Sequence, residues 1–335
     1  MEQQVISQIV QASGVQASET VLVHFWGDDE DLPIARGFMQ AVMEQGASPW
    51  LLQQSRRVNQ QLFAAAKSDC FDEDYFRLLD QVDAVLDVFA YQPIILGARL
   101  EDGQQQIYRR YMGTLFRQLM KAGRFVQIRI PTAANAEESG LPPEEYICRM
   151  NEAYAVDYGQ LKQACEAAVK VYPAGRYQIH TGADCVLEVN LAGRTWHVDA
   201  GDGDWPCGEV YIAPVEEDTR GRVHYPVLYV EDLGRFDAVT LDVEGGRVTG
   251  CDHAAVQAWL DTLPAEGRVV AELGLGMNPG VGALCGYTVL DEKKAGSFHL
   301  ALGANTMFGG KNAAGMHVDL VNDGAWSMKE EKGHG

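Results

Sequence analysis

The segment SFHLALGANTMFGGKNAAGMHVDL (residues 297–320) contains two histidines and one aspartate among apolar residues and glycines. Within it, residues 316–320 alternate between apolar and polar side chains, a pattern that predicts a β-strand. Successive side chains of a strand point to opposite faces, so His317 and Asp319 would share one face. An imidazole and a carboxylate held side by side in this way form half of a metal site. A complete site needs further ligands from elsewhere in the chain.

The residues upstream of this segment, from about position 173, show the same alternation. Short alternating runs are interrupted by glycine and aspartate turns, which is typical of antiparallel strands. The runs span residues 185–191, 194–198, 210–213, 227–230 and 238–243, and one clear helix is predicted at 253–263. We therefore predict a β-rich α+β C-terminal domain over residues 173–328, followed by a disordered tail over 329–335.

The first half of the chain alternates strands with helices instead. Apolar runs predict the strands, and segments with helical periodicity lie between them. The strands are predicted at residues 21–26, 48–53, 83–89 and 124–130, and the helices at 33–45, 108–122 and 143–171. This alternation indicates βαβ units. We predict an α/β N-terminal domain with a mostly parallel sheet over residues 1–172.

The composition restricts the class of protein. The chain has 335 residues, which is long for one core and suggests two domains. Its formal net charge of −20 would repel nucleic acid and anionic membranes, and no apolar run is long enough to span a bilayer. The seven cysteines form no CxxC pair, which indicates reduced thiols. Because the N-terminus also lacks the features of a signal peptide, we expect a cytoplasmic protein.

Four further candidate metal ligands stand near or within apolar runs. Glu209 begins an apolar strand, and Glu272 interrupts a run that should be buried, where an unpaired carboxylate is costly. Glu292 is more ambiguous, since two lysines follow it and a solvated turn would explain the group. His299 lies in an apolar segment, where, taken alone, a hydrogen-bonded core histidine is the simpler interpretation.

Considered together, the six residues support one another. They combine nitrogen and oxygen ligands, include no cysteine, and all fall in the predicted C-terminal domain. Such a set is what two divalent ions sharing a bridging carboxylate require. A pair of ions would lower the pKa of a bridging water and polarise a carbonyl oxygen, as amide hydrolysis requires. The predicted metal ligands are Glu209, Glu272, Glu292, His299, His317 and Asp319.

Four short motifs resemble those of the aminopeptidase T/aminopeptidase S family of metallopeptidases, the thermophilic aminopeptidases. In the order of the family they are GEV at 208–210 followed by Pro214, AELGLGMNP at 271–279, DE at 291–292 followed by HLALG at 299–303, and HVD at 317–319. The resemblance covers most of the chain in layout and is sharpest from about residue 182. It implies an α/β domain with a β-rich metal domain, a site for two divalent ions (Zn, Mn or Co), and a homodimer.

The same resemblance implies an activity. Members of the family remove N-terminal residues from peptides, so we expect a metallo-aminopeptidase-like hydrolase that acts on short peptides or a related small amide. Either Glu209 or Glu272 would serve as general base or anchor the substrate amine, and the residues leave open which of the two does so.

One position departs from the family pattern. The peptidases carry a tyrosine seven residues after the histidine of HLALG, where its hydroxyl can stabilise an oxyanion. In this chain the position is occupied by Thr306. Its shorter hydroxyl, or the amide of Asn305, would have to substitute, so Thr306 joins Glu209 and Glu272 as a candidate catalytic residue.

Two other functions stay open. Dihydroxypyridine ring-cleaving dioxygenases resemble these peptidases but hold one Fe(II) through two histidines and one aspartate, the ligand type of non-haem oxygenases. In this chain Glu272 stands where the extra histidine is expected, and the other peptidase ligands are present, which favours the hydrolase. The replaced tyrosine also leaves open a metal-binding protein without peptidase activity.

Overall fold

The computed structural model describes residues 1–93, 99–182, 184–231 and 233–331. The chain forms two compact units, and neither is one continuous segment. The first unit consists of Met1–Tyr158 and Gly201–Cys207, and the second of Gly159–Ala200 and Gly208–Gly335. The domain bounds 1–172 and 173–328 stay a prediction, and the units differ from them in the assignment of residues 159–172 and 201–207.

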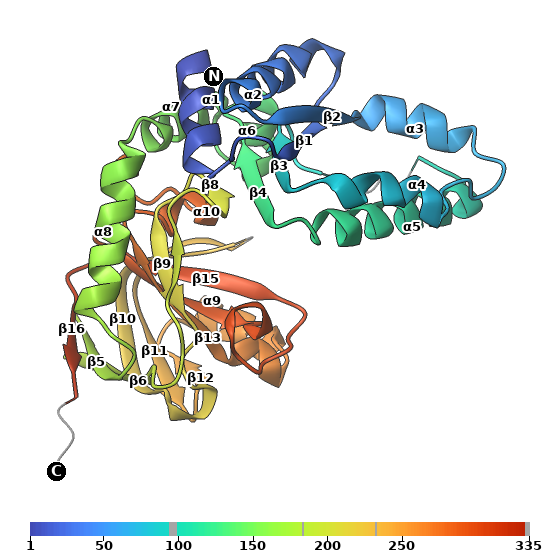
Figure 1. Cartoon of the computed structure of the whole chain (residues 1–335). Helices are drawn as coiled ribbons and strands as arrows, with labels where there is room; N and C mark the ends of the chain where they lie inside the picture. Colours follow the sequence, from blue (N-terminus) through green and yellow to red (C-terminus); the bar gives the residue numbers. More distant parts are fainter. Residues whose placement is uncertain (94–98, 183, 232, 332–335) are drawn as a thin grey trace. The chain divides into compact units, whose positions relative to one another are not determined.

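A parallel sheet forms the centre of the first unit (Figure 1). Its strands are β1 (Thr20–Trp26), β2 (Ser48–Gln54), β3 (Ala84–Phe89), β4 (Arg124–Arg129) and β8 (Asp204–Trp205). They follow the order β2-β1-β3-β4-β8, and every neighbouring pair is parallel. The apolar runs explain this arrangement, because the central strands of a parallel sheet are buried on both faces, as all of β3 is. The α/β prediction is confirmed.

Helices form most of the connections between these strands, as parallel pairing requires. They are α1 (Gln3–Ala12), α2 (Leu32–Glu44), α3 (Arg56–Ala64), α4 (Glu73–Arg77), α5 (Asp102–Leu119), α6 (Ala133–Ser139) and α7 (Pro143–Tyr154), with the 3-10 turns η1 (Asp29–Asp31) and η2 (Leu78–Gln81). Both α3 and α4 pack against α5 (Figure 1). The aromatic residues Phe63, Phe76 and Tyr111 lie in the core between them.

The single helix predicted over residues 143–171 is two helices, so that prediction was wrong. The first, α7, ends at Tyr154, and α8 (Tyr158–Val171) follows it. Ala155 leaves the helical conformation, with φ −86° and ψ 46°. Asp157 stands directly before α8, and aspartate favours the position that caps a new helix. The apolar residues keep the helical spacing on both sides of this break, so the break could not be predicted from the sequence.

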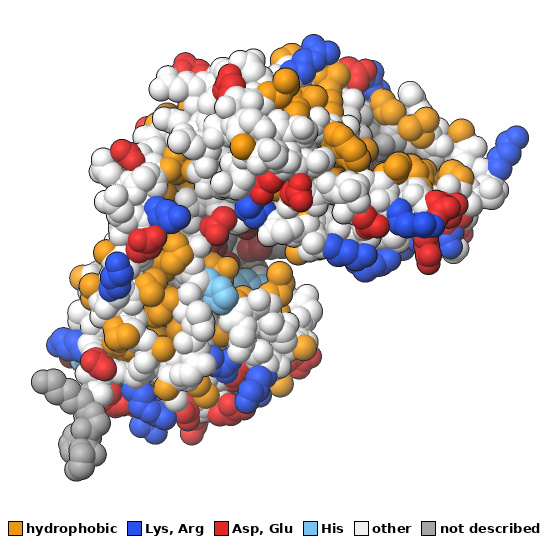
Figure 2. Space-filling model, in the orientation of Figure 1, with side chains coloured by type: hydrophobic (Ala, Val, Ile, Leu, Met, Phe, Trp, Pro, Cys, Tyr) orange, Lys and Arg blue, Asp and Glu red, His pale blue; other side chains and the backbone are white. Residues whose placement is uncertain are grey.

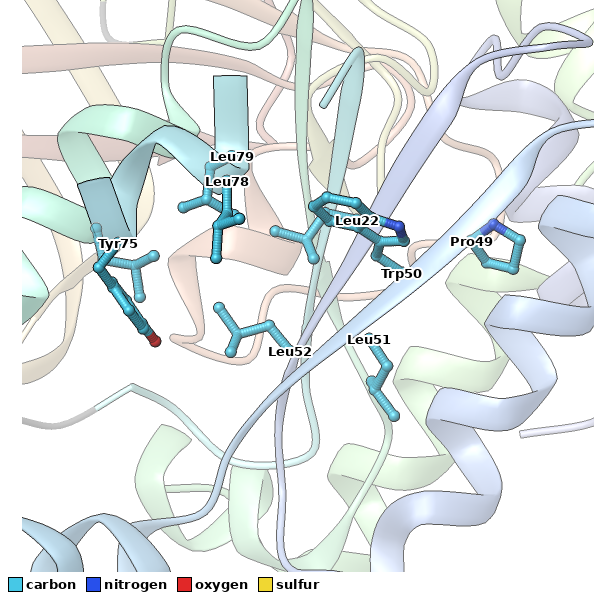
Figure 3. Close-up of a pocket in the computed structure, with 9 residues that line it drawn as sticks. Leu22, Pro49, Trp50, Leu51, Leu52, Tyr75, Leu78 and Leu79 are labelled. Atoms are coloured by element: carbon cyan, nitrogen blue, oxygen red, sulfur yellow. The ribbon is translucent and has the colours of Figure 1, made fainter. Parts of the chain in front are cut away.

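An apolar pocket opens in the first unit (Figure 3). It is lined by β2 together with α4 and the turn η2 that follows it. The lining residues are Leu22, Pro49, Trp50, Leu51, Leu52, Tyr75, Leu78, Leu79 and Leu115. None of the predicted site residues lines this pocket, so it is not part of the candidate site.

Two antiparallel sheets form the second unit. The six-stranded sheet contains β5 (Arg176–Thr181), β6 (Cys185–Asn190), β10 (Arg220–Val230), β11 (Gly234–Glu244), β12 (Arg247–Cys251) and β16 (Ser327–Glu330) in the order β12-β11-β10-β6-β5-β16. The five-stranded sheet contains β7 (His197–Asp199), β9 (Glu209–Ile212), β13 (Val270–Gly276), β14 (Phe298–Gly303) and β15 (His317–Asn322) in the order β15-β14-β13-β9-β7. This confirms the β-rich C-terminal prediction.

Short helices complete the second unit. Besides α8 they are α9 (Ala254–Thr262) and α10 (Thr288–Asp291), with the 3-10 turns η3 (Glu216–Asp218), η4 (Ala265–Arg268) and η5 (Thr306–Phe308). The helix predicted over residues 253–263 corresponds to α9. Residues 288–291, which form α10, lead directly to one of the predicted metal ligands.

The predicted disorder of residues 329–335 was wrong for the start of that segment. Lys329 and Glu330 belong to β16 and pair with Gln178 and Tyr177 of β5. A free edge strand gains backbone hydrogen bonds by accepting such a partner, and this outweighs the polar character of the tail. Residues 332–335 lie outside the described residues.

The surface carries both signs of charge. Figure 2 shows acidic and basic side chains interspersed on the face that it displays, without a continuous basic surface. Among the described residues, no helix combines the length and the apolar character that crossing a bilayer requires.

Candidate metal centre

Four neighbouring strands of the five-stranded sheet, β9, β13, β14 and β15, carry five of the six predicted ligands. Glu209 begins β9, Glu272 lies in β13 and His299 in β14. His317 and Asp319 lie two residues apart in β15. All five belong to the second unit, so the pairing of these strands sets their positions.

Each of these ligands pairs with a glycine or an alanine on a neighbouring strand. The pairs are Glu209 with Gly276, His299 with Gly274, His317 with Gly303, and both Glu272 and Asp319 with Ala301. A Cβ atom at Gly274 would lie 2.1 Å from the ring of His299, so only glycine leaves room for this imidazole. The small residues of the motif at 271–279 therefore provide space for the candidate ligands.

His299 lies at the centre of the cluster. Its Nε2 is 3.1 Å from Glu272 Oε1 and 3.5 Å from Glu209 Oε2. Asp319 Oδ1 is 4.0 Å from the same nitrogen. His317 Nε2 lies 3.6 Å from Glu272 Oε2 and 3.5 Å from Asp319 Oδ1. Three overlapping groups drawn from the six residues each bring their ligand atoms within 4.8 Å of one another, which is close enough for them to share an ion.

Burial decreases across the cluster. The side chain of His299 is fully buried and that of Glu272 is 7 % exposed, whereas that of His317 is 33 % exposed. The cluster is thus closed around His299 and open to solvent at His317.

A backbone carbonyl orients the ring of His317. Its Nδ1 lies 2.8 Å from the carbonyl oxygen of Ala304. A hydrogen bond donated to this carbonyl keeps a proton on Nδ1 and leaves Nε2 as the ligand atom, an arrangement common to metal-binding histidines.

The carboxylates change the proton affinity of both imidazoles. Burial lowers the pKa of His299, but the hydrogen bond with Glu272 and the charges of Glu209 and Asp319 outweigh it and raise the pKa to about 10. Burial also lowers the pKa of His317, and its carboxylate neighbours raise it to about 9. Burial raises the pKa of Glu209 to about 8. At neutral pH the cluster therefore holds protons, which a metal ion has to displace.

The donor set fits a divalent cation. Glu209 Oε2 and Asp319 Oδ1 are buried and have no hydrogen-bond partner among the described residues. Buried carboxylate oxygens without partners are costly, and both of these lie within 4.0 Å of His299 Nε2. Imidazole nitrogens combined with carboxylate oxygens suit divalent Zn, Mn, Co or Fe. A bound ion would satisfy both oxygens.

Glu292, the sixth predicted ligand, follows α10 instead of lying on a strand. Its side chain is 13 % exposed, and its Oε1 lies 2.8 Å from Lys293 Nζ. Lys293 is itself buried, so the alternative of a solvated turn was wrong for this residue. Sequence reasoning missed Lys293 because a lysine in a run of charged residues is usually exposed. Only the preceding residue, Glu292, was recognised as a candidate metal ligand.

The two positions that could replace the family tyrosine differ in their surroundings. Thr306 is exposed on η5. Asn305 is buried, and its amide nitrogen donates to Glu216 Oε1 at 3.1 Å and to the carbonyl oxygen of Ala271 at 3.3 Å. Both amide protons of Asn305 are used within the fold, so the idea that this amide binds a substrate oxygen was wrong.

A tyrosine that sequence reasoning did not single out lies near the cluster. Tyr211 shares a face of β9 with Glu209, because the two are separated by one residue. Burial raises the pKa of its hydroxyl, and the charges of Glu209 and Glu272 raise it further. Its ring lies 5.5 Å from that of Phe308, which lies 6.0 Å from the ring of His317. Its position two residues after Glu209 could have identified it from the sequence.

Fold and cluster together define a protein with a parallel α/β unit and a β-rich unit that carries a cluster of carboxylates and imidazoles able to hold a metal ion. The chain matches the thermophilic metalloprotease (M29) family over residues 4–327 and therefore belongs to that family. This confirms the resemblance to the aminopeptidase T/aminopeptidase S family and makes the chain a metallo-aminopeptidase-like hydrolase.

Two solved structures share the fold. Wild-type AmpT from Thermus thermophilus is 17 % identical, with a TM-score of 0.66 over 97 % of this chain and 94 % of that chain. The 2,5-dihydroxypyridine dioxygenase from Pseudomonas putida KT2440 is 16 % identical, with a TM-score of 0.66 over 98 % of this chain and 93 % of that chain. At such identities the likeness establishes the fold alone. Comparison with curated proteins gave no match.

Proposed function

We propose that this metalloprotease removes N-terminal residues from short peptides or cleaves a related small amide. The observation that carries the proposal is the convergence of Glu209, Glu272, His299, His317 and Asp319 from four paired strands. Family membership supports a peptidase reaction, and the partly open side at His317 gives a small substrate access.

The residues of the cluster would have different roles in amide hydrolysis. Glu272, His299, His317 and Asp319 would hold a divalent ion, which supplies a polarised carbonyl and an activated water when bound. Glu209 or Glu272 would accept the proton of that water or bind the substrate ammonium. Because burial raises the pKa of Glu209 to about 8, its carboxyl group can take up and release a proton near neutral pH, as a general base must.

Two side chains, those of Thr306 and Tyr211, are candidates for the hydroxyl that stabilises the oxyanion. Thr306 occupies the position of the family tyrosine, but its side chain is exposed. Tyr211 is partly buried beside Glu209, where a hydroxyl is better shielded from water. We expect Thr306→Ala to change kcat by less than about threefold and Tyr211→Phe to lower it by about 10²–10³. The opposite order would assign the role to Thr306.

The nature of the metal and the assembly also remain proposals. The resemblance implies two divalent ions held by the six predicted ligands, of which Glu272, His299, His317 and Asp319 would hold one; Zn, Mn or Co suits the mixture of nitrogen and oxygen donors. A homodimer follows from the resemblance to the thermophilic aminopeptidases. A cytoplasmic location is proposed from the scattered cysteines, which form no CxxC pair in the sequence.

A mononuclear Fe(II) dioxygenase is the second candidate. Within the cluster, His299, His317 and Asp319 would supply two imidazoles and one carboxylate, the type of set that non-haem iron oxygenases use, although Glu272 occupies the position where the resemblance expects the second histidine. The dioxygenase from Pseudomonas putida shares the fold. Against it, Glu272 adds a second carboxylate 3.1 Å from His299. Bound iron, together with oxygen uptake when a hydroxylated pyridine is supplied, would favour the dioxygenase. Metal binding without peptide hydrolysis or oxygen uptake would favour a non-catalytic metal-binding protein.

A dipeptide assay tests the hydrolase. Protein purified without chelators is supplied with Mn²⁺, Co²⁺ or Zn²⁺, and amino acid release is measured at neutral to alkaline pH. Glu272→Gln should reduce release to the level of the chelated protein, because it removes a ligand without changing side-chain size. Glu266→Gln, the same change at an exposed carboxylate, is the control. Equal turnover by Glu272→Gln and the unchanged protein would contradict the proposal.

A further inference from the structure

Lys293 lies buried against the carboxylates of the candidate centre. The residue is 1 % exposed. Its Nζ lies 2.5 Å from Glu209 Oε1, 2.8 Å from Glu292 Oε1 and 3.8 Å from Asp199 Oδ2. Two of these three carboxylates are predicted metal ligands. An ammonium therefore lies between two oxygens that a second divalent ion would need.

The backbone fixes Lys293 in this position. Its carbonyl oxygen accepts a hydrogen bond of 2.7 Å from the backbone nitrogen of Asn278, and Asn278 is itself buried. A Cβ atom at Gly276 would lie 2.1 Å from the carbonyl oxygen of Lys294 and 2.7 Å from that of Glu292. Glycine at 276 is thus required for this segment to approach β13.

The neighbouring aspartate holds the same segment from its other side. Asp291 accepts backbone hydrogen bonds from Cys285 at 3.0 Å and from Gly286 at 2.7 Å. These contacts direct Asp291 away from the cluster and leave Glu292 and Lys293 to face it. Because the chain is held on both sides and the side chain is buried, Lys293 is not a surface lysine that happens to bend inward.

By their contacts with Lys293 the ligands fall into two sets, which overlap because Glu292 also has a ligand atom within 4.8 Å of those of His299 and Asp319. In the first set, Glu209 Oε1 accepts a hydrogen bond from the ammonium, and Glu292 Oε1 forms an ion pair with it. The second set is Glu272, His299, His317 and Asp319, in which each imidazole nitrogen Nε2 lies within 4.0 Å of a carboxylate oxygen of Glu272 and of Asp319. Glu209 Oε2, which has no hydrogen-bond partner among the described residues, lies 3.5 Å from His299 Nε2 and remains available to an ion in the second set.

We infer that the ammonium of Lys293 takes the place of one of the two metal ions, so that the centre binds a single divalent ion through Glu272, His299, His317 and Asp319. A divalent ion placed between Glu209 and Glu292 would meet a positive charge in a site of low dielectric, where like charges repel strongly. Lys293 also holds Glu209 so that its second oxygen faces the ion. This inference rests on the metal centre of the proposed function but not on the reaction.

Metal stoichiometry tests the inference without an activity assay. The full-length protein, stripped with chelator, is dialysed against saturating Mn²⁺, and bound manganese is measured for three proteins. The unchanged protein should bind one ion per chain. Lys293→Met, which keeps the length of the side chain but removes its charge, should bind two, because Glu209 and Glu292 then lack a cation. Lys294→Met, the same change at the adjacent lysine, should bind one.

Each result has a distinct meaning. Two ions in the unchanged protein would overturn the inference, and so would one ion in Lys293→Met. No ion in the unchanged protein would refute the metal centre of the proposed function itself, which separates the two failures.

Crystals of the unchanged protein grown with Mn²⁺ give a second measurement that does not depend on folding of the variant. One anomalous peak beside His299 and His317, with Lys293 between Glu209 and Glu292, is the expected result. A second peak at the position of the ammonium would overturn the inference.

Discussion

Each unit of this protein buries a histidine against a carboxylate on the neighbouring strand, but the two pairs differ in what surrounds them. In the parallel sheet, His24 of β1 lies beside Asp87 of β3, with 2.8 Å between Nδ1 and Oδ1, and neither side chain is exposed. In the five-stranded antiparallel sheet, His299 of β14 lies 3.1 Å from Glu272 of β13.

The first pair is enclosed by large rings. Trp26 donates its Nε1 to Asp87 at 3.2 Å, and the rings of Trp26 and Phe116 lie 5.4 and 5.9 Å from that of His24. The second pair lies among small residues and further carboxylates. No group of three or more potential metal ligands occurs in the first unit within the described residues. The two pairs thus differ in that, among the residues that the structure describes, only the second has the space and the additional ligand atoms that a metal site requires.

Breaking the pair in the parallel sheet should have the largest effect, and only on stability. Asp87→Ala leaves His24 without its partner in the core, which costs about 3–5 kcal/mol in the free energy of unfolding. Denaturation by urea measures this loss, and metal analysis should show unchanged occupancy. Replacing both residues by leucine should restore much of the stability, since a buried pair is often no better than apolar packing. Loss of metal in Asp87→Ala would contradict the comparison.

Removing the space beside His299 should affect metal binding instead. In Gly274→Ala the new methyl group meets the imidazole, so the ring must move and metal affinity should fall by about 10–100-fold, as for changes that misalign a ligand. Titration calorimetry with Mn²⁺ measures the change. Gly282→Ala is the matched control, because a Cβ there has no atom within 4 Å. Equal affinities in the two variants would show that the space is not needed.

Changes in pH should reveal competition between protons and the metal ion for the histidines of the candidate centre. Folding raises the pKa of His299 from 6.5 to about 10 and that of His317 from 6.5 to about 9. In the chelated protein, these histidines contribute stability that is complete below about pH 6.5 and is lost as the pH rises through about 9–10. Metal affinity should rise over the same interval, by about tenfold per pH unit for each proton displaced.

Thermal unfolding with and without Mn²⁺ measures this dependence. The melting temperature of the chelated protein should fall between pH 6.5 and 10, and the stabilisation by Mn²⁺ should grow. A pH-independent difference between the two forms would mean that metal and protons do not compete for these imidazoles.

The sheets were the predictable part of the fold, because their periodicity is local. Apolar runs and alternating runs indicated both the parallel and the antiparallel sheets. The two-residue strand β8 and the terminal strand β16 were not predicted, since such short segments have no period and gain their structure from the strands they pair with.

The candidate site shows the same division between local and distant causes. Five of the six candidate ligands could be predicted because each begins or interrupts an apolar strand, as His299 does, or repeats the alternation, as His317 and Asp319 do. Lys293 could not be predicted, because its burial depends on Asn278 and Gly276, which bring a distant strand against it. The exposure of Thr306 likewise depends on the turn that it occupies.

Residues 201–207 have a consequence for any attempt to divide this molecule. The polypeptide leaves the second unit after Ala200, contributes β8 to the first, and returns at Gly208, one residue before the ligand Glu209. A gene split after codon 158 would therefore encode two fragments, one without the outermost strand of its sheet and the other carrying that strand with nothing to pair with.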